Sequence, residues 1–398
     1  MTAQMRKPII LCFVAYYLPG YRSGGPVRTI ANFVDHLGDE FDIRIMTRDR
    51  DALDTEPYPS VQIDAWNKVG KAQVFYASEK MVTLRGIAKL LRETPHDVLY
   101  LNSFFAFGFT TLPLLACRLG WAPKTPCMIA PRGEFSQGAI AQKKKKKRLY
   151  MRATRRMGLY AGLHWQASSE FEASDIQREL GGLAADISVA PDLPPAIDAA
   201  GLQAVPHNPR SDGPLRLVFL SRISPMKNLD FLLEVLGRVT SPIELLIYGP
   251  LREPDYWSHC QALIAGLPAN IQVDYRGEVT PLEVPKTFAS ADLFVFPTRG
   301  ENFGHVILEA LCAGTAVLIS DRTPWQSSGD KAVEVLPLED TESWVKAIEY
   351  WAGFDCQQFA QMRAAALGYA LRYLQTSQAL EQNRSLFRDV FEKPKEVL

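Results

Sequence analysis

The chain has 398 residues, of which 47% are apolar and 22% charged, the composition of a globular protein with a sizeable core. Its 44 basic and 44 acidic residues give a formal net charge of zero, so no bulk affinity for nucleic acid is expected. The length suggests about two to three domains.

The six cysteines are scattered without a Cys-x-x-Cys pair, which predicts buried free thiols in a reducing compartment. No apolar run reaches transmembrane length. The apolar run 9–18 has the hydropathy of a signal peptide, but it leads into Pro19-Gly20 and Gly24-Gly25 rather than a small-residue cleavage site. We therefore expect a buried first strand and a cytoplasmic protein.

Strands and helices are predicted to alternate through the first half of the chain, which indicates an α/β domain with a parallel sheet. The stretch 54–70, with two prolines and Trp66, shows no clear pattern. The expected strands are 9–16, 42–47, 98–101, 127–130, 163–167 and 187–190, and the expected helices are 27–37, 81–93 and one from residue 169.

Two loops near the N-terminus carry candidate residues. Gly24 and Gly25 lie between the first strand and the first helix, where backbone amides can approach a phosphate closely, although an ordinary tight turn has the same composition. Asp49 and Asp51 form an Asp-x-Asp, but no third oxygen ligand has a clear spacing, so we expect a polar loop and no metal.

Polar residues also end two later strands. Asn102 is followed by four phenylalanines within seven residues, which either fill the core or line an apolar acceptor site. Arg132 and Glu134 end the strand 127–130. We take Asn102, Arg132 and Glu134 as candidate residues for binding an acceptor substrate.

Residues 191–214 are rich in Pro, Ala and Gly and lack periodicity, so they mark the best domain boundary. A second series of strands follows at 215–220, 243–248, 271–275, 292–297 and 315–320, with a helix at 229–239, and only helices are expected from residue 325 onward. Two similar α/β halves with a cleft between them are the predicted architecture.

Basic residues and glycines follow the first strands of this second half. Arg222 and Lys227 flank the N-terminus of the helix 229–239, where a diphosphate finds both positive charge and exposed N–H groups. Gly249 follows the strand 243–248, and Gly277 and Val279 follow the strand 271–275, at positions where ordinary strand-end turns are also expected.

The segment 292–324 predicts one βαβ unit, with a loop and a helix N-terminus at the carboxyl end of a parallel strand. Glu301 lies in the loop, and His305 and Glu309 are four residues apart on one helix face. A carboxylate that stabilises the helix dipole and a solvent-exposed polar helix face would have the same pattern.

The segment Glu301-Asn-Phe-Gly-His-Val-Ile-Leu-Glu309 resembles the Glu-x7-Glu signature of family 4 glycosyltransferases, retaining enzymes of the GT-B fold. Asn302 replaces the usual glycine, and asparagine is the next-best residue at positive φ.

This resemblance implies a site for a nucleotide-diphosphate sugar. Arg222 and Lys227 match the pair that clamps the diphosphate, and Glu301 would hold the sugar hydroxyls. The resemblance also implies a donor site lined by Gly24, Gly25, Gly249, Gly277, Val279, Asn302, Phe303, Gly304, His305 and Glu309, the last of them on the ribose. No metal and no other cofactor is implied. The implied domains are 1–191 for the acceptor, 192–214 as linker, 215–375 for the donor, and 376–398 as a helix returning to the first domain.

Pro-Arg-Gly-Glu segments like 131–134 occur in a subset of this family that builds bacterial surface polysaccharides. The resemblance thus implies transfer to a lipid-linked glycan in exopolysaccharide, capsule or lipopolysaccharide assembly. An NDP-sugar epimerase of the same fold and a catalytically silent nucleotide- or glycan-binding partner remain alternatives. The nucleotide base, the sugar and the linkage are open.

The segment 143–156 holds nine Lys or Arg residues and no acid. A solvated helix face is one interpretation. A nucleic-acid arm is disfavoured, because no base-reading module accompanies it. The functional hypothesis is docking on the anionic inner face of the plasma membrane through Lys143, Lys144, Lys145, Lys146, Lys147 and Arg148.

Overall fold

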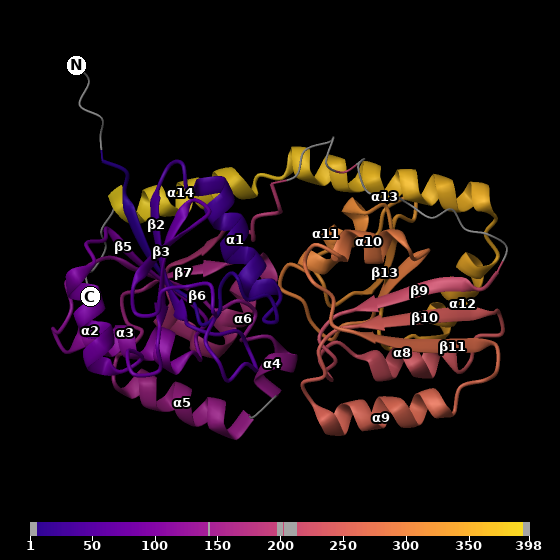
Figure 1. The fold of residues 1–398 in the computed structure, drawn as a ribbon, viewed down its shortest axis with the longest axis horizontal. Coiled ribbons are helices and arrows are strands. Elements are labelled where there is room, and N and C mark those ends of the chain that lie inside the picture. The colour runs from indigo at the N-terminus through magenta and orange to yellow at the C-terminus, as the bar shows by residue number, and fades with distance from the viewer. Residues whose placement is uncertain (1–5, 142–143, 197–201, 203–212, 393–398) are drawn as a thin grey trace, which may run out of the picture. The chain divides into compact units, whose positions relative to one another are not determined.

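The computed structural model describes residues 6–141, 144–196, 202 and 213–392. The chain forms two compact α/β units, one of residues 1–196 with 378–398 and one of residues 197–377 (Figure 1). The change of unit after residue 196 falls inside the segment 191–214, where low periodicity had suggested a boundary.

The first unit is built on an eight-stranded sheet in the order β3-β4-β2-β1-β5-β6-β7-β8. All neighbouring strands are parallel except β3, which is antiparallel to β4. The strands are β1 (Ile9–Phe13), β2 (Asp42–Arg48), β3 (Trp66–Val69), β4 (Ala72–Ala77), β5 (Val98–Asn102), β6 (Cys127–Ala130), β7 (His164–Ala167) and β8 (Ile187–Val189).

Helices cover both faces of this sheet because its central strands are apolar on both sides. In β1, Leu11 and Phe13 point into one apolar cluster, whereas Ile10 and Cys12 point into the other. The helical segments are α1 (Gly25–Leu37), α2 (Leu84–Glu93), the π-helix η1 (Phe107–Thr111), α3 (Leu112–Arg118), α4 (Gln137–Ala141), α5 (Lys144–Arg156), α6 (Glu170–Leu180) and the 3₁₀ helix η2 (Gly181–Ala184).

The last helix, α14 (Ala379–Glu392), belongs to the first unit and packs beside α1 (Figure 1). Phe387 lies with its ring centroid 5.2 Å from Phe33 and 5.3 Å from Tyr100. Arg384 pairs with Glu40 at 2.6 Å. The predicted return of the C-terminal helix to the first domain is confirmed.

The second unit has a six-stranded sheet in the order β11-β10-β9-β12-β13-β14, parallel throughout. The strands are β9 (Leu215–Leu220), β10 (Ile243–Tyr248), β11 (Ile271–Gly277), β12 (Leu293–Phe296), β13 (Ala316–Ser320) and β14 (Val333–Leu336). The order reverses at β9, so a topological switch point lies between β9 and β12, where open α/β sheets bind ligands.

Figure 1 shows α10, α11 and α13 over one face of this sheet and α8 and α9 over the other. The helices are α8 (Leu229–Leu236), α9 (Pro254–Ala265), α10 (Val284–Ala289), α11 (His305–Cys312), α12 (Thr341–Ala352) and α13 (Cys356–Thr376). One continuous apolar cluster of strand and helix residues forms the core.

Several expectations need correction. The stretch 54–70 contains β3, and the helices expected after residue 325 are preceded by β14. Helix α2 begins at Leu84 rather than at residue 81, because the Thr83 hydroxyl accepts a hydrogen bond from Gly86 N at 3.2 Å and caps the helix there. Five cysteines are buried as expected, but Cys356 is exposed at the start of α13.

Candidate functional site

The candidate residues of the second unit follow four strands that are neighbours in its sheet, β11, β10, β9 and β12. The loop after β9 carries Arg222 and Lys227, and the loop after β12 carries Glu301. Because parallel strands end at one edge, these side chains share the carboxyl edge of the sheet.

Asn228 connects the loops after β9 and β12 through hydrogen bonds of its side chain. It has a left-handed φ of 62° and is the N-cap of α8. Its amide nitrogen donates to Pro297 O at 2.9 Å, and its amide oxygen accepts from Arg299 Nε at 2.8 Å. Asn228 and Arg299 were not predicted from the sequence; the one available signal was an asparagine directly before a helix, where left-handed backbone is tolerated.

Lys227 and Glu301 form an ion pair at the centre of the site. The side chain of Lys227 is 9% exposed and that of Glu301 is 17% exposed. The Lys227 ammonium also lies 5.4 Å from the centroid of the Phe296 ring. Burial lowers the pKa of Lys227, whereas the Glu301 carboxylate raises it and the positive charge of Arg222 lowers it.

Arg222 is exposed beside this pair. Within the described ranges it makes no hydrogen bond or ion pair through its side chain, in contrast to Lys227. The edge of the sheet therefore holds one buried, paired cation and one exposed cation whose donors are available to an anion.

The loop after β12 turns into α11 at Gly304, which has a φ of 81°. Asn302 is not among the described non-glycine residues with positive φ. The expectation of positive φ at Asn302 is therefore wrong, and the left-handed residue of this loop is Gly304. The positive φ favours glycine at this position, and a Cβ there would lie 2.8 Å from Ile307 Cδ1, so the isoleucine side chain would have to shift. The Phe303 carbonyl accepts a hydrogen bond from Trp325 Nε1 at 2.6 Å.

His305 and Glu309 lie one turn apart on α11. His305 is buried, with its ring centroid 4.7 Å from that of Phe303, so it packs within the unit. Glu309 is half-buried, and its charge contributes to the raised pKa of Cys312, after the larger effect of burial.

Gly249 and Gly277 meet at the ends of β10 and β11, where Gly249 N donates to Gly277 O at 2.8 Å. Gly249 has a φ of 138°, and a Cβ there would lie 1.8 Å from Ser221 O. The chain thus needs glycine at this position to approach the loop that carries Arg222. Val279 is half-buried beyond β11.

In the first unit, Gly24 is the N-cap of α1 with a φ of 66°, and a Cβ at Gly24 or Gly25 would meet nothing within 4 Å. Asp51 holds this loop, because its carboxylate accepts from Tyr21 N at 2.8 Å and Arg22 N at 3.1 Å. Asp49 pairs with Arg50 at 2.8 Å. The described ranges contain no cluster of three or more potential His, Cys, Asp or Glu ligands.

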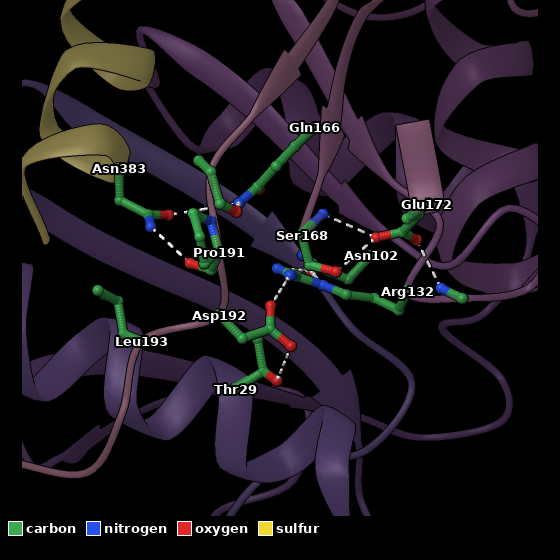
Figure 2. A network of polar contacts seen from close by, with 12 residues as sticks. Thr29, Asn102, Arg132, Gln166, Ser168, Glu172, Pro191, Asp192, Leu193 and Asn383 are labelled. Atoms are coloured by element: carbon green, nitrogen blue, oxygen red, sulfur yellow. Dashed lines mark hydrogen bonds and ion pairs between the residues drawn. The ribbon is translucent and has the colours of Figure 1, made fainter. Parts of the chain in front are cut away.

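Arg132 lies in a buried polar network (Figure 2). Its guanidinium donates to Asn102 Oδ1 at 3.0 and 3.1 Å, to the Tyr100 hydroxyl and to Asp192, with which it forms an ion pair. Asp192 also accepts from Thr29 Oγ1 at 3.0 Å. The side chain of Arg132 is only 10% exposed, so these partners occupy the N–H donors that would otherwise bind an acceptor substrate.

Glu134 is likewise satisfied within the unit. Its carboxylate accepts from Ser103 Oγ at 2.7 Å, Phe104 N at 2.5 Å and Phe105 N at 3.1 Å. Burial raises the pKa of Glu134. The ring of Phe104 stacks on Tyr160 with centroids 4.3 Å apart, whereas Phe107 is 62% exposed, so the phenylalanines mostly fill the core.

The basic segment forms α5. Lys144, Lys145, Lys146 and Arg148 are exposed, as is Leu149, at 70%. Lys147 turns inward: its ammonium donates to Ala139 O at 2.8 Å and lies 4.6 Å from the centroid of the Phe105 ring. Lys143 lies outside the described residues.

Part of the second unit is similar in sequence to known glycosyltransferases. Residues 204–352 match the family described as glycosyl transferases group 1. The chain is 30% identical over 174 residues to a phosphatidyl-myo-inositol mannosyltransferase of Mycobacterium tuberculosis, an alignment covering 41% of this chain and 43% of that protein. It is also 30% identical over 103 residues to a sulfoquinovosyl transferase of Arabidopsis thaliana, covering 26% of this chain and 18% of that protein. The chain thus aligns with under half the length of these relatives.

Solved structures match over nearly the whole chain. The HepE protein of Anabaena, solved with UDP and glucose, superposes with a TM-score of 0.67 at 15% identity, covering 97% of this chain and 100% of that one. WaaG, a glycosyltransferase involved in lipopolysaccharide biosynthesis, superposes with a TM-score of 0.62 at 14% identity, covering 96% and 99%. Residues 204–352 are thus similar to the group 1 glycosyl transferases, in a chain that has the two-unit GT-B fold.

Proposed function

We propose that the protein transfers a sugar from a nucleotide-diphosphate sugar to a lipid-linked glycan acceptor, with retention of anomeric configuration. The observation that carries this proposal is the buried Lys227–Glu301 pair beside the exposed Arg222 at the carboxyl edge of the second sheet. This arrangement supplies two cations and one carboxylate at the switch point of the sheet.

The cations match the charge that develops in the reaction. When the bond between the anomeric carbon and the diphosphate ionises, the leaving oxygen gains negative charge. Arg222 and Lys227 would neutralise that charge, together with amides at the start of α8. Removing one such group typically costs ~10²–10³ in kcat.

The loop after β12 would hold the rest of the donor. Glu301 would accept hydrogen bonds from the sugar hydroxyls, with the amides of Phe303 and Gly304 beside it, and Glu309 would accept from the ribose hydroxyls. No side chain is assigned as general base, and a phosphate oxygen of the donor would take the proton of the acceptor. Because Arg222 and Lys227 supply the positive charge, we propose that the reaction needs no metal and no other cofactor.

We further propose that the protein works at the anionic inner face of the plasma membrane, in exopolysaccharide, capsule or lipopolysaccharide assembly. The exposed lysines of α5 support this proposal, since basic residues near an anionic surface contribute ~1 kcal/mol each. The name of one relative, a phosphatidyl-myo-inositol mannosyltransferase, and that of one structural neighbour, a glycosyltransferase of lipopolysaccharide biosynthesis, agree with a lipid-linked acceptor. None of the helices in the described ranges has both the length and the apolar character needed to span a bilayer.

The test of the transfer proposal uses a panel of nucleotide sugars, with and without lipid extract and with and without EDTA. We expect nucleotide release that requires lipid extract and survives EDTA, together with a glycosylated lipid product. Conversion of the donor without any acceptor would instead indicate an epimerase, and binding without turnover a silent partner. Loss of activity in EDTA with rescue by Mg²⁺ or Mn²⁺ would contradict the metal-independent reaction.

Membrane docking is tested separately by co-sedimentation with liposomes. We expect binding that requires anionic lipid, weakens steeply with salt and decreases when Lys144, Lys145 and Lys146 become Glu. Equal sedimentation with neutral liposomes would rule out electrostatic docking.

A further inference from the structure

A pocket of about 200 Å³ lies on the first unit, between the C-terminal half of α5 and the end of α6 with η2. Its basic lining is Arg148, Arg152 and Arg155, spaced four and three residues apart on one face of α5. Its remaining lining is Met151, Leu180, Leu183 and Glu179. The pocket therefore combines three guanidinium groups with an apolar wall.

No contact of these three arginines with the described residues explains their clustering. All three are exposed, and with the part of the chain that the structure describes they make no hydrogen bond or ion pair. They do not donate to the terminal carbonyls of α6, the other common use of cations beside a helix end. Three like charges on neighbouring turns repel one another, so an anion between them would relieve a cost that the free protein bears.

The single carboxylate in the pocket is already engaged. Glu179 accepts from Arg178 Nε at 3.1 Å, and Arg178 also donates to Phe135 O at 2.9 Å. The formal charge of the lining remains positive. Guanidinium groups bind phosphate oxygens through paired hydrogen bonds, which matches this surplus of donors.

The apolar wall distinguishes the expected ligand from a free inorganic anion. Leu180 is buried, while Met151 and Leu183 are half-buried and pack against the core of the unit. Leu149, on the same turn as Arg148 and Arg152, leaves 70% of its surface exposed. Phosphate next to apolar surface is the chemistry of a phospholipid at the boundary between headgroup and acyl chain.

We propose that this pocket binds the phosphate-bearing headgroup of one anionic phospholipid. Its volume is below the ~300–1,000 Å³ of sites that enclose a drug-sized ligand, so it is too small to enclose a nucleotide sugar, whereas a phosphate-bearing headgroup is smaller. This proposal rests on the membrane docking proposed above, to which it adds a site that binds one lipid molecule per chain. The lysines 144–146 contribute only a diffuse field at the other end of α5, whereas the arginines recognise a single molecule.

The test compares two variants matched in charge, Arg148→Gln/Arg152→Gln/Arg155→Gln in the pocket and Lys144→Gln/Lys145→Gln/Lys146→Gln outside it. Each removes three positive charges from exposed positions of α5. The probe is monomeric dihexanoyl phosphatidylglycerol in isothermal titration calorimetry, with dihexanoyl phosphatidylcholine, inorganic phosphate and a short single-stranded RNA as comparison ligands. Circular dichroism and the melting temperature verify that both variants are folded.

We expect one phosphatidylglycerol per chain, with affinity reduced roughly a hundredfold in the arginine variant and nearly unchanged in the lysine variant. Inorganic phosphate should bind much more weakly, because it cannot use the apolar wall. Equal losses in both variants, or RNA or phosphate binding as tightly as the lipid, would overturn the site. The calorimetric measurement involves neither liposomes nor sugar transfer. A negative result would therefore refute the lipid pocket without refuting the transfer or the membrane-docking proposal.

Discussion

At the residue scale, opposing effects act on the charged form of Lys227. Burial favours its neutral form, the Glu301 carboxylate favours its charged form, and Arg222 opposes that charge. The net result is a lowered pKa, although the ion pair is intact. An incoming diphosphate would add negative charge to this balance and raise the pKa again.

Glu301→Gln should abolish most transfer and also reduce stability, because Lys227 loses its carboxylate partner. A buried group left without its partner costs about 1–3 kcal/mol. The lysine then binds fewer protons in the folded than in the unfolded state. Stability should therefore rise as the pH increases from the lowered pKa of Lys227 towards the unfolded value of ~10.4. Urea denaturation across this range measures the effect.

The control is Glu301→Gln with Lys227→Met, which removes the buried charge altogether. This double variant should lack the rise in stability above neutral pH. If it retains the rise, the pH dependence comes from another group. Transfer by Glu301→Gln at the wild-type rate would rule out the proposed role of the carboxylate.

Binding of a nucleoside diphosphate should weaken as the pH rises through the lowered pKa of Lys227, because only the protonated ammonium pairs with the anion. Calorimetric titrations between about pH 7 and pH 10 would show the loss, together with proton uptake on binding. In Lys227→Arg the guanidinium stays charged throughout this range, so that variant should keep a constant affinity. The same pH dependence in both proteins would assign the titration to the nucleotide.

At the scale of elements, the site depends on close contact between strand ends. Gly249 lets the end of β10 approach the loop after β9, and Asn228 ties that loop to the one after β12. The three loops are therefore in contact with one another, so that a shift of one loop changes the position of Arg222 relative to Glu301.

Gly249→Ala should destabilise the second unit and weaken nucleotide binding. The new Cβ would lie 1.8 Å from Ser221 O, so the loop that carries Arg222 must move. The matched control is Gly277→Ala, where φ is 79° but no atom lies within 4 Å of the new Cβ. That change should cost only the ~1–2 kcal/mol of a left-handed alanine. Thermal denaturation with and without UDP compares the two, and equal effects would contradict the steric argument.

At the scale of the whole molecule, the network of Figure 2 connects segments that are far apart in the sequence. Arg132 follows β6, Asp192 lies where the chain leaves the first unit, and Asn383 on α14 donates to Pro191 O at 2.8 Å. Gln166 joins these parts by donating to Ala190 O at 3.0 Å. Residues 190–192 and helix α14, which lie on either side of the second unit in the sequence, are thus joined to the first sheet by polar contacts.

Arg132→Met should destabilise the first unit by about 3–5 kcal/mol, because Asp192 would remain buried without its cation. Adding Asp192→Leu should recover much of this loss, as both charges are then removed. Arg384→Gln on α14 breaks a more exposed pair and should cost at most about 1 kcal/mol. Calorimetric unfolding of the three variants measures these differences. A small effect of Arg132→Met would show that the network contributes little.

The sequence by itself determined the strand and helix alternation, the two α/β units and the place of the residues Arg222, Lys227 and Glu301. Apolar runs that are buried on both faces and glycines at strand ends are local signals. The strands β3 and β14 escaped notice because they are short and only half-buried, so no apolar run marks them.

Tertiary structure alone decided which polar residues at strand ends are available to a ligand. Arg132 and Arg222 each follow a parallel strand and carry the same local signal, yet one is buried against Asp192 and the other is exposed. The partner of Arg132 lies 60 residues away in the sequence. The same holds for α5, where Lys147 turns inward and the arginines of the pocket do not. Whether a charge is satisfied depends on such distant groups, because its free energy is set by what surrounds it in space.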